Sequence, residues 1–196
     1  MDSTDPHLLS ARVLILYSTV DGHTRHICER LRTCFEDAGA SVVLRDMSAS
    51  PGDDLEGCDL VLVGASIRYG FHRRAVRDFM RASRVALQAR PNAFFSVNLV
   101  ARKSAKGEAA TNPYLQHFLR SIGWRPRYLE VFAGRLDYPG CNPLDRLMIR
   151  LIMWMTGGPT DPHTVIEYTD WQRVDAFGDL LLGVLRDAGR TGRTMP

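Results

Sequence analysis

Residues 13–24 read Val-Leu-Ile-Leu-Tyr-Ser-Thr-Val-Asp-Gly-His-Thr, and the two parts of this stretch differ in character. The first five residues form a short, continuous apolar run, which is typical of a strand covered on both faces in a parallel sheet. The next seven are mostly polar and lead into apolar residues at helical spacing, from Ile27 to Ala38. A buried strand, a polar loop and a helix in this order predict the first unit of a parallel α/β sheet.

The same alternation of strand and helix continues along the chain. The further strands are expected at 41–44, 60–63, 93–99 and 128–133, and the further helices at about 72–90, 113–122 and 170–188. Five strands with crossover helices predict an α/β fold with a flavodoxin-like, five-stranded parallel sheet in the order 2-1-3-4-5 and helices on both faces. A Rossmann sheet is the alternative, but the G-x-G-x-x-G motif that it needs is absent after the first strand.

The length of 196 residues fits one domain. We expect this domain to span residues 12–188, with a flexible extension at 1–11 and a flexible tail at 189–196. The segment at about 135–164 is too long for a simple link between the fifth strand and the last helix. It is therefore expected to be an insertion within the domain.

The insertion carries its own apolar helix, expected at 143–156 after Asn142 as N-cap. Apolar side chains occupy nearly all of its faces, and two interpretations remain open: a helix packed in the core, or a surface that meets substrate, quinone or lipid. A helix of this length spans about 21 Å, which is too short to cross a bilayer, so a membrane contact would lie in the bilayer surface. Arg146 and Arg150 would then face anionic lipid. The candidate contacts with membrane or quinone are Leu147, Ile152 and Trp154.

Charge and cysteine content exclude several classes of protein. Lys and Arg number 25 against 22 Asp and Glu, and a net charge of +3 is too weak and too mixed to predict a nucleic-acid partner. The four cysteines show no C-x-x-C spacing, so we expect no metal site and no redox motif. The first residues do not resemble a secretion signal, and no apolar stretch is long enough to cross a bilayer. A cytoplasmic protein is expected, which leaves a position on a membrane surface open.

Ligands of an open parallel sheet bind beyond the carboxyl ends of the strands, at the point where the strand order reverses. Three loops are expected to meet there, at 18–24, 64–70 and 98–103. The first combines hydroxyl groups with backbone N–H groups at a helix N-terminus, which suits a phosphate; an ordinary helix N-cap is the alternative. Asp21 would repel a phosphate and is therefore expected to point away. Together the three loops predict a crevice for a flat aromatic cofactor.

Four longer motifs resemble those of a known enzyme family. They are Gly64-Ala-Ser-Ile-Arg-Tyr-Gly70, Ser96-Val-Asn-Leu-Val-Ala-Arg-Lys103, Trp124-Arg-Pro126 and Tyr168-Thr-Asp-Trp171. Over about residues 12–188, the chain resembles the bacterial menaquinone-dependent protoporphyrinogen IX dehydrogenases, which are flavodoxin-like enzymes of haem biosynthesis. It departs from that family in its N-terminal extension, and its phosphate loop differs from the Thr-Gly-Asn type of ordinary flavodoxins.

This resemblance implies a bound FMN, protoporphyrinogen IX as the reductant, and menaquinone or ubiquinone as the acceptor. Six electrons would leave the substrate in three two-electron steps to the flavin N5, so no side chain is expected to be catalytic. The residues expected to bind the cofactor are Ser18, Thr19, Val20, Asp21, Gly22, His23, Thr24, Ser66, Ile67, Tyr69, Gly70, Asn98, Leu99 and Val100. The residues expected to bind the propionate groups of the substrate are Arg68, Arg102 and Lys103.

A quinone dissolved in the bilayer requires the flavin crevice to come near it. We therefore expect a peripheral protein at the cytoplasmic face of the cell membrane, and a homo-oligomer stays open. Two other functions also stay open: an electron-carrying flavodoxin, and an NAD(P)H:quinone reductase on the same fold. The apolar insertion argues against the first, because a small electron carrier needs no such arm.

Overall fold

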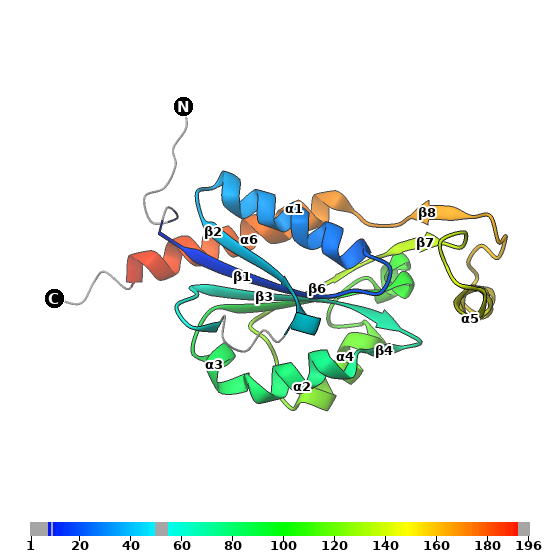
Figure 1. Cartoon of the computed structure of the whole chain (residues 1–196), viewed down its shortest axis with the longest axis horizontal. Helices are drawn as coiled ribbons and strands as arrows, with labels where there is room; N and C mark the ends of the chain where they lie inside the picture. The colour runs from blue at the N-terminus through cyan, green and yellow to red at the C-terminus, as the bar shows by residue number, and fades with distance from the viewer. Residues whose placement is uncertain (1–7, 9, 50–54, 192–196) are drawn as a thin grey trace.

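A parallel sheet forms the centre of the computed structural model, which describes residues 8, 10–49 and 55–191 (Figure 1). Its five long strands are β1 (Arg12–Ser18), β2 (Ser41–Asp46), β3 (Leu60–Arg68), β5 (Asn92–Val97) and β6 (Tyr128–Phe132). They pair in parallel in the order β2-β1-β3-β5-β6, which confirms the predicted order 2-1-3-4-5. The short β4 (Phe71–His72) pairs antiparallel with the end of β3 and lies outside this path.

Helices cover both faces of the sheet, as predicted. One face carries α1 (His23–Asp37) and α6 (Trp171–Thr191), and the other carries α2 (Arg74–Ala82), α3 (Arg84–Gln88) and α4 (Pro113–Ile122) (Figure 1). Successive residues of a strand point to opposite faces, so the continuous apolar runs of β1 and β3 supply two core clusters. Ile15 and Leu62 lie in the cluster under α1 and α6, whereas Leu14, Leu16 and Val63 pack toward the other helices.

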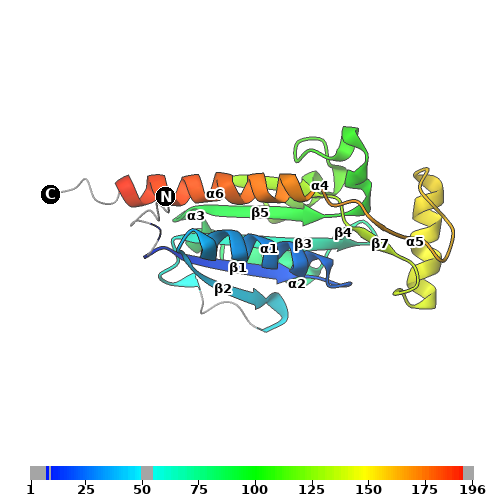
Figure 2. The ribbon, with the colours of Figure 1, turned by 90° about the horizontal axis from the view of Figure 1, so that it is seen from above.

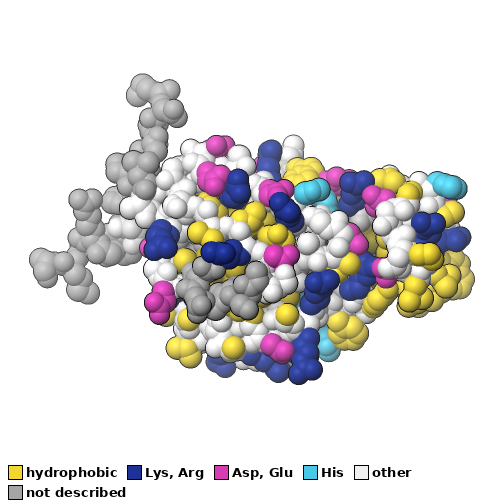
Figure 3. Space-filling model, in the orientation of Figure 1, with side chains coloured by type: hydrophobic (Ala, Val, Ile, Leu, Met, Phe, Trp, Pro, Cys, Tyr) yellow, Lys and Arg dark blue, Asp and Glu magenta, His cyan; other side chains and the backbone are white. Residues whose placement is uncertain are grey.

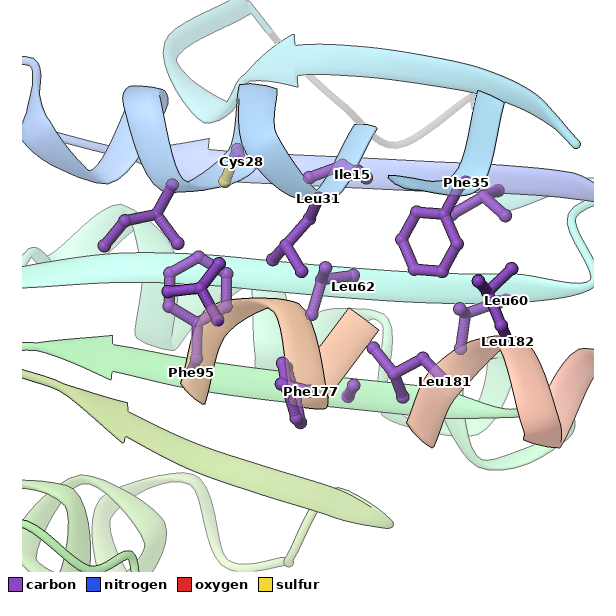
Figure 4. Packing of buried hydrophobic residues seen from close by; sticks show 14 of the residues in the cluster. Ile15, Cys28, Leu31, Phe35, Leu60, Leu62, Phe95, Phe177, Leu181 and Leu182 are labelled. Atoms are coloured by element: carbon purple, nitrogen blue, oxygen red, sulfur yellow. The ribbon is translucent and has the colours of Figure 1, made fainter. Parts of the chain in front are cut away.

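The cluster under α1 and α6 shows why these two helices form and where they dock. Their buried apolar residues recur at helical spacing, with Leu31 and Phe35 on α1 and Phe177 and Leu181 on α6 (Figure 4). Both sets point toward the sheet, where they meet side chains such as Leu62. The two helices therefore lie side by side and fix the direction in which the N-terminus of α1 points.

Several boundaries differ from the expected ones. Residues 72–90, expected as one helix, form α2 and α3, because the backbone at Ser83 leaves the helical conformation and closes α2. The strand expected to reach residue 99 ends at Val97, and a 3-10 turn follows at Leu99–Arg102. Leu8, within the expected flexible extension, is buried in the core. At the other end, α6 continues to Thr191.

The rest of the expected termini, residues 1–7, 9 and 192–196, lies outside the described residues.

The insertion forms a separate arm at one end of the molecule. Two short strands, β7 (Arg135–Asp137) and β8 (Val165–Glu167), pair antiparallel and carry α5 (Pro143–Met155) beyond the end of the sheet (Figure 2). Asn142 caps α5 through a bond from the Asp145 N–H to its side-chain oxygen, as predicted. Within the described part of the chain, no helix has the length and apolarity to cross a membrane.

Gly64 on β3 should tolerate no side chain, because Phe95 on the neighbouring strand fills the space. An added Cβ would lie 2.2 Å from the Phe95 ring. We expect Gly64→Ala to lower the free energy of unfolding by about 1–3 kcal/mol, the usual cost of overpacking, measured by denaturant unfolding. Gly183→Ala in α6 is the control: apart from the adjoining residues and backbone of the helix itself, none of the described atoms comes within 4 Å of its added Cβ, so it should stabilise the helix slightly. Equal effects of the two variants would contradict this account.

Candidate functional site

A cavity of about 460 Å³ lies at the carboxyl ends of β1, β3 and β5, where the strand order reverses. Its size falls within the range of small-molecule and cofactor sites. All three predicted loops contribute to its wall. The expected residues that line it are Thr19, Val20, Asp21, His23, Thr24, Ser66, Ile67, Arg68, Tyr69, Gly70, Asn98, Leu99 and Val100. Ser18 and Gly22 belong to the first loop but do not line the cavity, and neither do Arg102 and Lys103.

The loop before α1 leaves the start of this helix open to a ligand. Gly22 precedes the helix with a φ of +79°, a left-handed conformation that favours glycine. No side chain in the described ranges caps α1, although Asn112 and Asn142 cap α4 and α5. The alternative of an ordinary helix N-cap therefore does not describe this loop. Uncapped N–H groups at a helix N-terminus suit an anion such as a phosphate.

Thr24 adds a second, independent indication of a ligand. Its side chain is fully buried and lines the cavity. Its hydroxyl oxygen has no hydrogen-bond partner among the residues that the structure describes. Buried hydroxyls without a partner are rare, because the unmet hydrogen bond costs free energy. A phosphate oxygen from a ligand would supply the missing partner, so the residues present fit a phosphate-bearing cofactor.

His23 has a different part in the same loop. Its Nε2 lies 2.6 Å from Thr169 Oγ1, and Thr169 in turn donates to the Ala133 carbonyl. Burial lowers the pKa of His23, so the imidazole is uncharged at neutral pH. It therefore brings no positive charge to the cavity and instead ties the loop to the segment before α6.

The turn after β3 places an aromatic ring at the edge of the cavity. Tyr69 adopts a φ of +51°, which is unusual for a residue with a side chain, and Gly70 follows with a φ of +89°. The Tyr69 hydroxyl donates to the carboxylate of Asp145 on α5, and the Arg68 guanidinium lies 5.5 Å from the centre of the Tyr69 ring. These contacts hold the backbone and the ring in a conformation that would otherwise be costly.

The third loop is shaped by Asn98 from inside. The side chain is buried, and its Oδ1 accepts from the Ala101 N–H at 3.0 Å and from Asn112 Nδ2 at 3.4 Å. Asn98 thereby fixes the 3-10 turn that presents Leu99 and Val100 to the cavity. The Asn98 side-chain oxygen already accepts two hydrogen bonds from the protein, so Asn98 positions this part of the cavity wall. The neighbouring Leu99 and Val100 supply the surface that a ligand would contact.

The structure does not bring together the three residues expected to bind propionates. Arg68 lines the cavity, but its guanidinium pairs with Asp21 and Asp145. Arg102 donates to the Leu99 carbonyl at 2.8 Å and to Thr156 at the end of α5. Lys103 is exposed outside the cavity. Arg102 therefore connects the third loop to the end of α5.

The inserted helix α5 has one buried side and one exposed apolar side, so parts of both interpretations left open by the sequence apply to it. Met153 is buried against Leu136 and Tyr138, and Ile152 is half-buried and lines the cavity together with Ile149. The opposite side is exposed and defines the outer face of α5. Its members are Leu144, Leu147, Leu151, Trp154 and Met155. Figure 3 shows apolar side chains gathered at this end of the molecule.

Of the three residues expected to contact membrane or quinone, Leu147 and Trp154 thus lie on the outer face, and Ile152 does not. The expectation that Arg146 and Arg150 face lipid is not supported. Arg146 donates to the Tyr138 carbonyl at 3.0 Å, and Arg150 donates to the Thr160 carbonyl at 2.8 Å. Both side chains turn back to satisfy carbonyls of the arm.

Comparison with known proteins identifies the family. Residues 14–163 match a family model described as a flavodoxin domain. A protein of Escherichia coli (strain K12) named protoporphyrinogen IX dehydrogenase [quinone] is 42% identical over 166 residues, which cover 85% of this chain and 92% of that protein. This chain belongs to the protoporphyrinogen IX dehydrogenase (quinone) family. A relative of the same name from Leishmania major is 42% identical over 169 residues, which cover 86% of this chain and 73% of the relative.

Solved structures agree on the fold of this dehydrogenase family. A flavodoxin from the domain Archaea superposes with a TM-score of 0.50 at 13% identity, covering 89% of this chain and 99% of that one. The rubredoxin oxygen:oxidoreductase of Desulfovibrio gigas superposes with a TM-score of 0.53 at 13% identity, covering 92% of this chain and 38% of that one. The family membership and the flavodoxin fold, both predicted from the sequence, are confirmed. The family indicates a flavin as the cofactor.

Sequence reasoning missed one wall of this dehydrogenase cavity. The further lining residues are His26, Val97, Tyr114, Gly134, Arg135, Leu136, Asp137, Gly140, Cys141, Ile149 and Ile152, of which Ile152 was expected as a contact with membrane or quinone. Most of them belong to β7, the turn after it and α5, which close the cavity from the side of the insertion. The Pro139-Gly140 dipeptide after the short alternating stretch Arg135–Tyr138 was the available signal for a short strand that ends in a turn at this point.

Proposed function

We propose that this chain oxidises protoporphyrinogen IX to protoporphyrin IX, with FMN as its cofactor and a membrane quinone as the electron acceptor. The observation that carries this function is the 42% identity to proteins named protoporphyrinogen IX dehydrogenase [quinone], over 92% of the length of the Escherichia coli relative. The cavity agrees with it, because its open helix N-terminus and its apolar walls suit a phosphate-bearing aromatic cofactor.

The first loop supports FMN as the flavin. The N–H groups at the start of α1 and the Thr24 hydroxyl offer hydrogen bonds to one phosphate group. FMN, when bound, supplies an acceptor of two electrons that a quinone can reoxidise. Leu99, Ile149 and Ile152 give the cavity apolar walls that exclude water from the reacting groups. The role of the chain is therefore to bind and orient the cofactor and to shield the reacting groups from water.

The outer face of α5 supports a peripheral contact with the cytoplasmic face of the cell membrane. Trp154 is 72% exposed and Leu147 is 62% exposed, which is unusual for neighbouring large apolar side chains on one helix. A helix that lies in a membrane surface places its apolar side in the lipid, with tryptophan at the headgroup level. The opposite side of the same helix lines the cavity, so such a contact brings the cavity close to quinone in the bilayer.

Two assays test the proposed function. Purified protein should oxidise protoporphyrinogen IX with a quinone, and NADPH with the same quinone should give far lower turnover. Quinone reduction with NADPH but not with protoporphyrinogen IX would indicate an NAD(P)H:quinone reductase. No quinone reduction with either donor would indicate an electron carrier. Denaturation should release FMN; release of FAD, or no flavin after reconstitution, would contradict the cofactor proposal.

A further inference from the structure

Arg68 lies between two carboxylates, Asp21 in the first loop of the cavity wall and Asp145 on the inserted helix. Its Nη1 is 3.1 Å and 3.2 Å from the two carboxylate oxygens of Asp21 in the first loop. Its Nη2 donates to the carboxylate of Asp145 in the first turn of α5. One guanidinium therefore connects the phosphate loop, the turn after β3 and the inserted helix.

The two ends of this bridge differ in burial. The Arg68 side chain is 19% exposed and that of Asp145 is 14% exposed, whereas Asp21 is 62% exposed. Asp145 also accepts from the Tyr69 hydroxyl and from Asn142 Nδ2, so its carboxylate is well satisfied. A shielded, multiply bonded ion pair holds its geometry, and an exposed one contributes little by itself. Asp145 thus fixes Arg68, and Arg68 in turn fixes Asp21.

Asp21 poses an electrostatic problem for the first loop. Its carboxylate belongs to the same short loop as Thr24 and the open N-terminus of α1, which suit a phosphate. A phosphate ester carries nearly two negative charges at neutral pH, so an unpaired carboxylate nearby would oppose its binding. The single positive charge of Arg68 is shared between Asp21 and Asp145, so it offsets part of the negative charge at Asp21 and holds the Asp21 oxygens in one direction.

We propose that Arg68 is a positioning residue for the cofactor phosphate. Fixed by Asp145, it offsets the negative charge of Asp21 and so favours the binding of a phosphate at the first loop. Since Asp145 belongs to α5, the seating of the inserted helix supports phosphate binding at the opposite wall. The proposal rests on the proposed binding of FMN, and it gives Arg68 a role other than binding a substrate carboxylate.

Competition between FMN and riboflavin on the flavin-loaded protein tests this role. Riboflavin shares the rings and the ribityl chain of FMN but lacks the phosphate, so the ratio of the two affinities isolates the phosphate site. We expect Arg68→Gln to lower the preference for FMN at least tenfold, because Asp21 then stands unpaired beside the loop. The double variant Arg68→Gln with Asp21→Asn should restore the preference to within threefold of the unmodified protein.

The matched control replaces another arginine that pairs with an aspartate but lies outside the cavity. Arg74 on α2 pairs with Asp78 in an exposed ion pair outside the cavity, so Arg74→Gln should leave the preference unchanged. An equal loss of FMN and riboflavin affinity in Arg68→Gln would overturn the proposal, since it would indicate a general role in shaping the cavity. Failure of Asp21→Asn to restore the preference would overturn it too. Failure of the unmodified protein to bind either flavin would instead refute the proposed function, and with it the basis of this role.

Discussion

Replacing Thr24 by valine should weaken FMN binding about tenfold to hundredfold without unfolding the protein. Valine has nearly the same shape as threonine and lacks the buried hydroxyl that has no partner among the described residues. A hydrogen bond to a charged group contributes roughly 1.5–3 kcal/mol, which corresponds to this range of affinity. Thr24→Asp should abolish flavin retention, because a buried carboxylate would meet the phosphate in a site shielded from water.

The measurement is flavin content after purification, followed by FMN titration of the variants that have lost it. Thr33 lies on the exposed side of the same helix and donates to the Glu29 carbonyl, so Thr33→Val and Thr33→Asp are matched controls. Both should retain FMN as the unmodified protein does. Normal FMN affinity in Thr24→Val would show that the Thr24 hydroxyl has no part in the site.

The sheet could be predicted because its strands carry the signal locally. β1 and β3 are apolar at consecutive positions, which is typical of a sheet covered on both faces, and a helix comes after each run, directly after the loop in the case of β1 and after the short β4 in the case of β3. From the strand order it also follows that the loops after β1, β3 and β5 share one edge. The cavity could therefore be placed from sequence alone.

The partners of the arginines could not be predicted in the same way. Arg68 pairs with Asp145, 77 residues further along the chain, and Arg102 donates to Thr156, 54 residues away. A sequence shows that a loop carries positive charge, but it does not show whether another segment of the chain already uses that charge. Both arginines were expected to bind substrate, and both have their donors engaged by the arm that the insertion forms.

The sequence likewise could not show which apolar side chains of the inserted helix are buried. Asn142 and Pro143 predicted where α5 begins, since capping is a local property. Which side of the helix is buried depends on the pairing of β7 with β8, and the sequence does not show that these two three-residue strands, one on each side of α5, pair with each other. Ile152 was therefore grouped with Leu147 as a contact with membrane or quinone, although Ile152 faces the cavity and Leu147 faces outward.

Polar substitutions on the outer face of α5 should release the protein from membranes. We expect Leu147→Ser, Leu151→Gln and Trp154→Gln, combined in one variant, to reduce binding to vesicles of phosphatidylethanolamine and phosphatidylglycerol at least a hundredfold. Transfer of each of these side chains into an apolar environment contributes on the order of 1.5–3 kcal/mol, and the three contributions add in partitioning. None of the three lines the cavity, so flavin content should stay normal.

The ratio of turnover with a bilayer-dissolved quinone to turnover with a water-soluble quinone should fall at least tenfold in this variant, because only the first acceptor requires the contact. Val43→Ser, Val85→Ser and Leu180→Gln, combined, form the control, since these residues are exposed apolar side chains on other elements. The control should bind vesicles as the unmodified protein does. If the α5 variant kept its vesicle binding but changed from a dimer to a monomer, the outer face would be a contact between two copies of this chain. Unfolding of the variant would instead mean that these side chains stabilise the arm, which their exposure argues against.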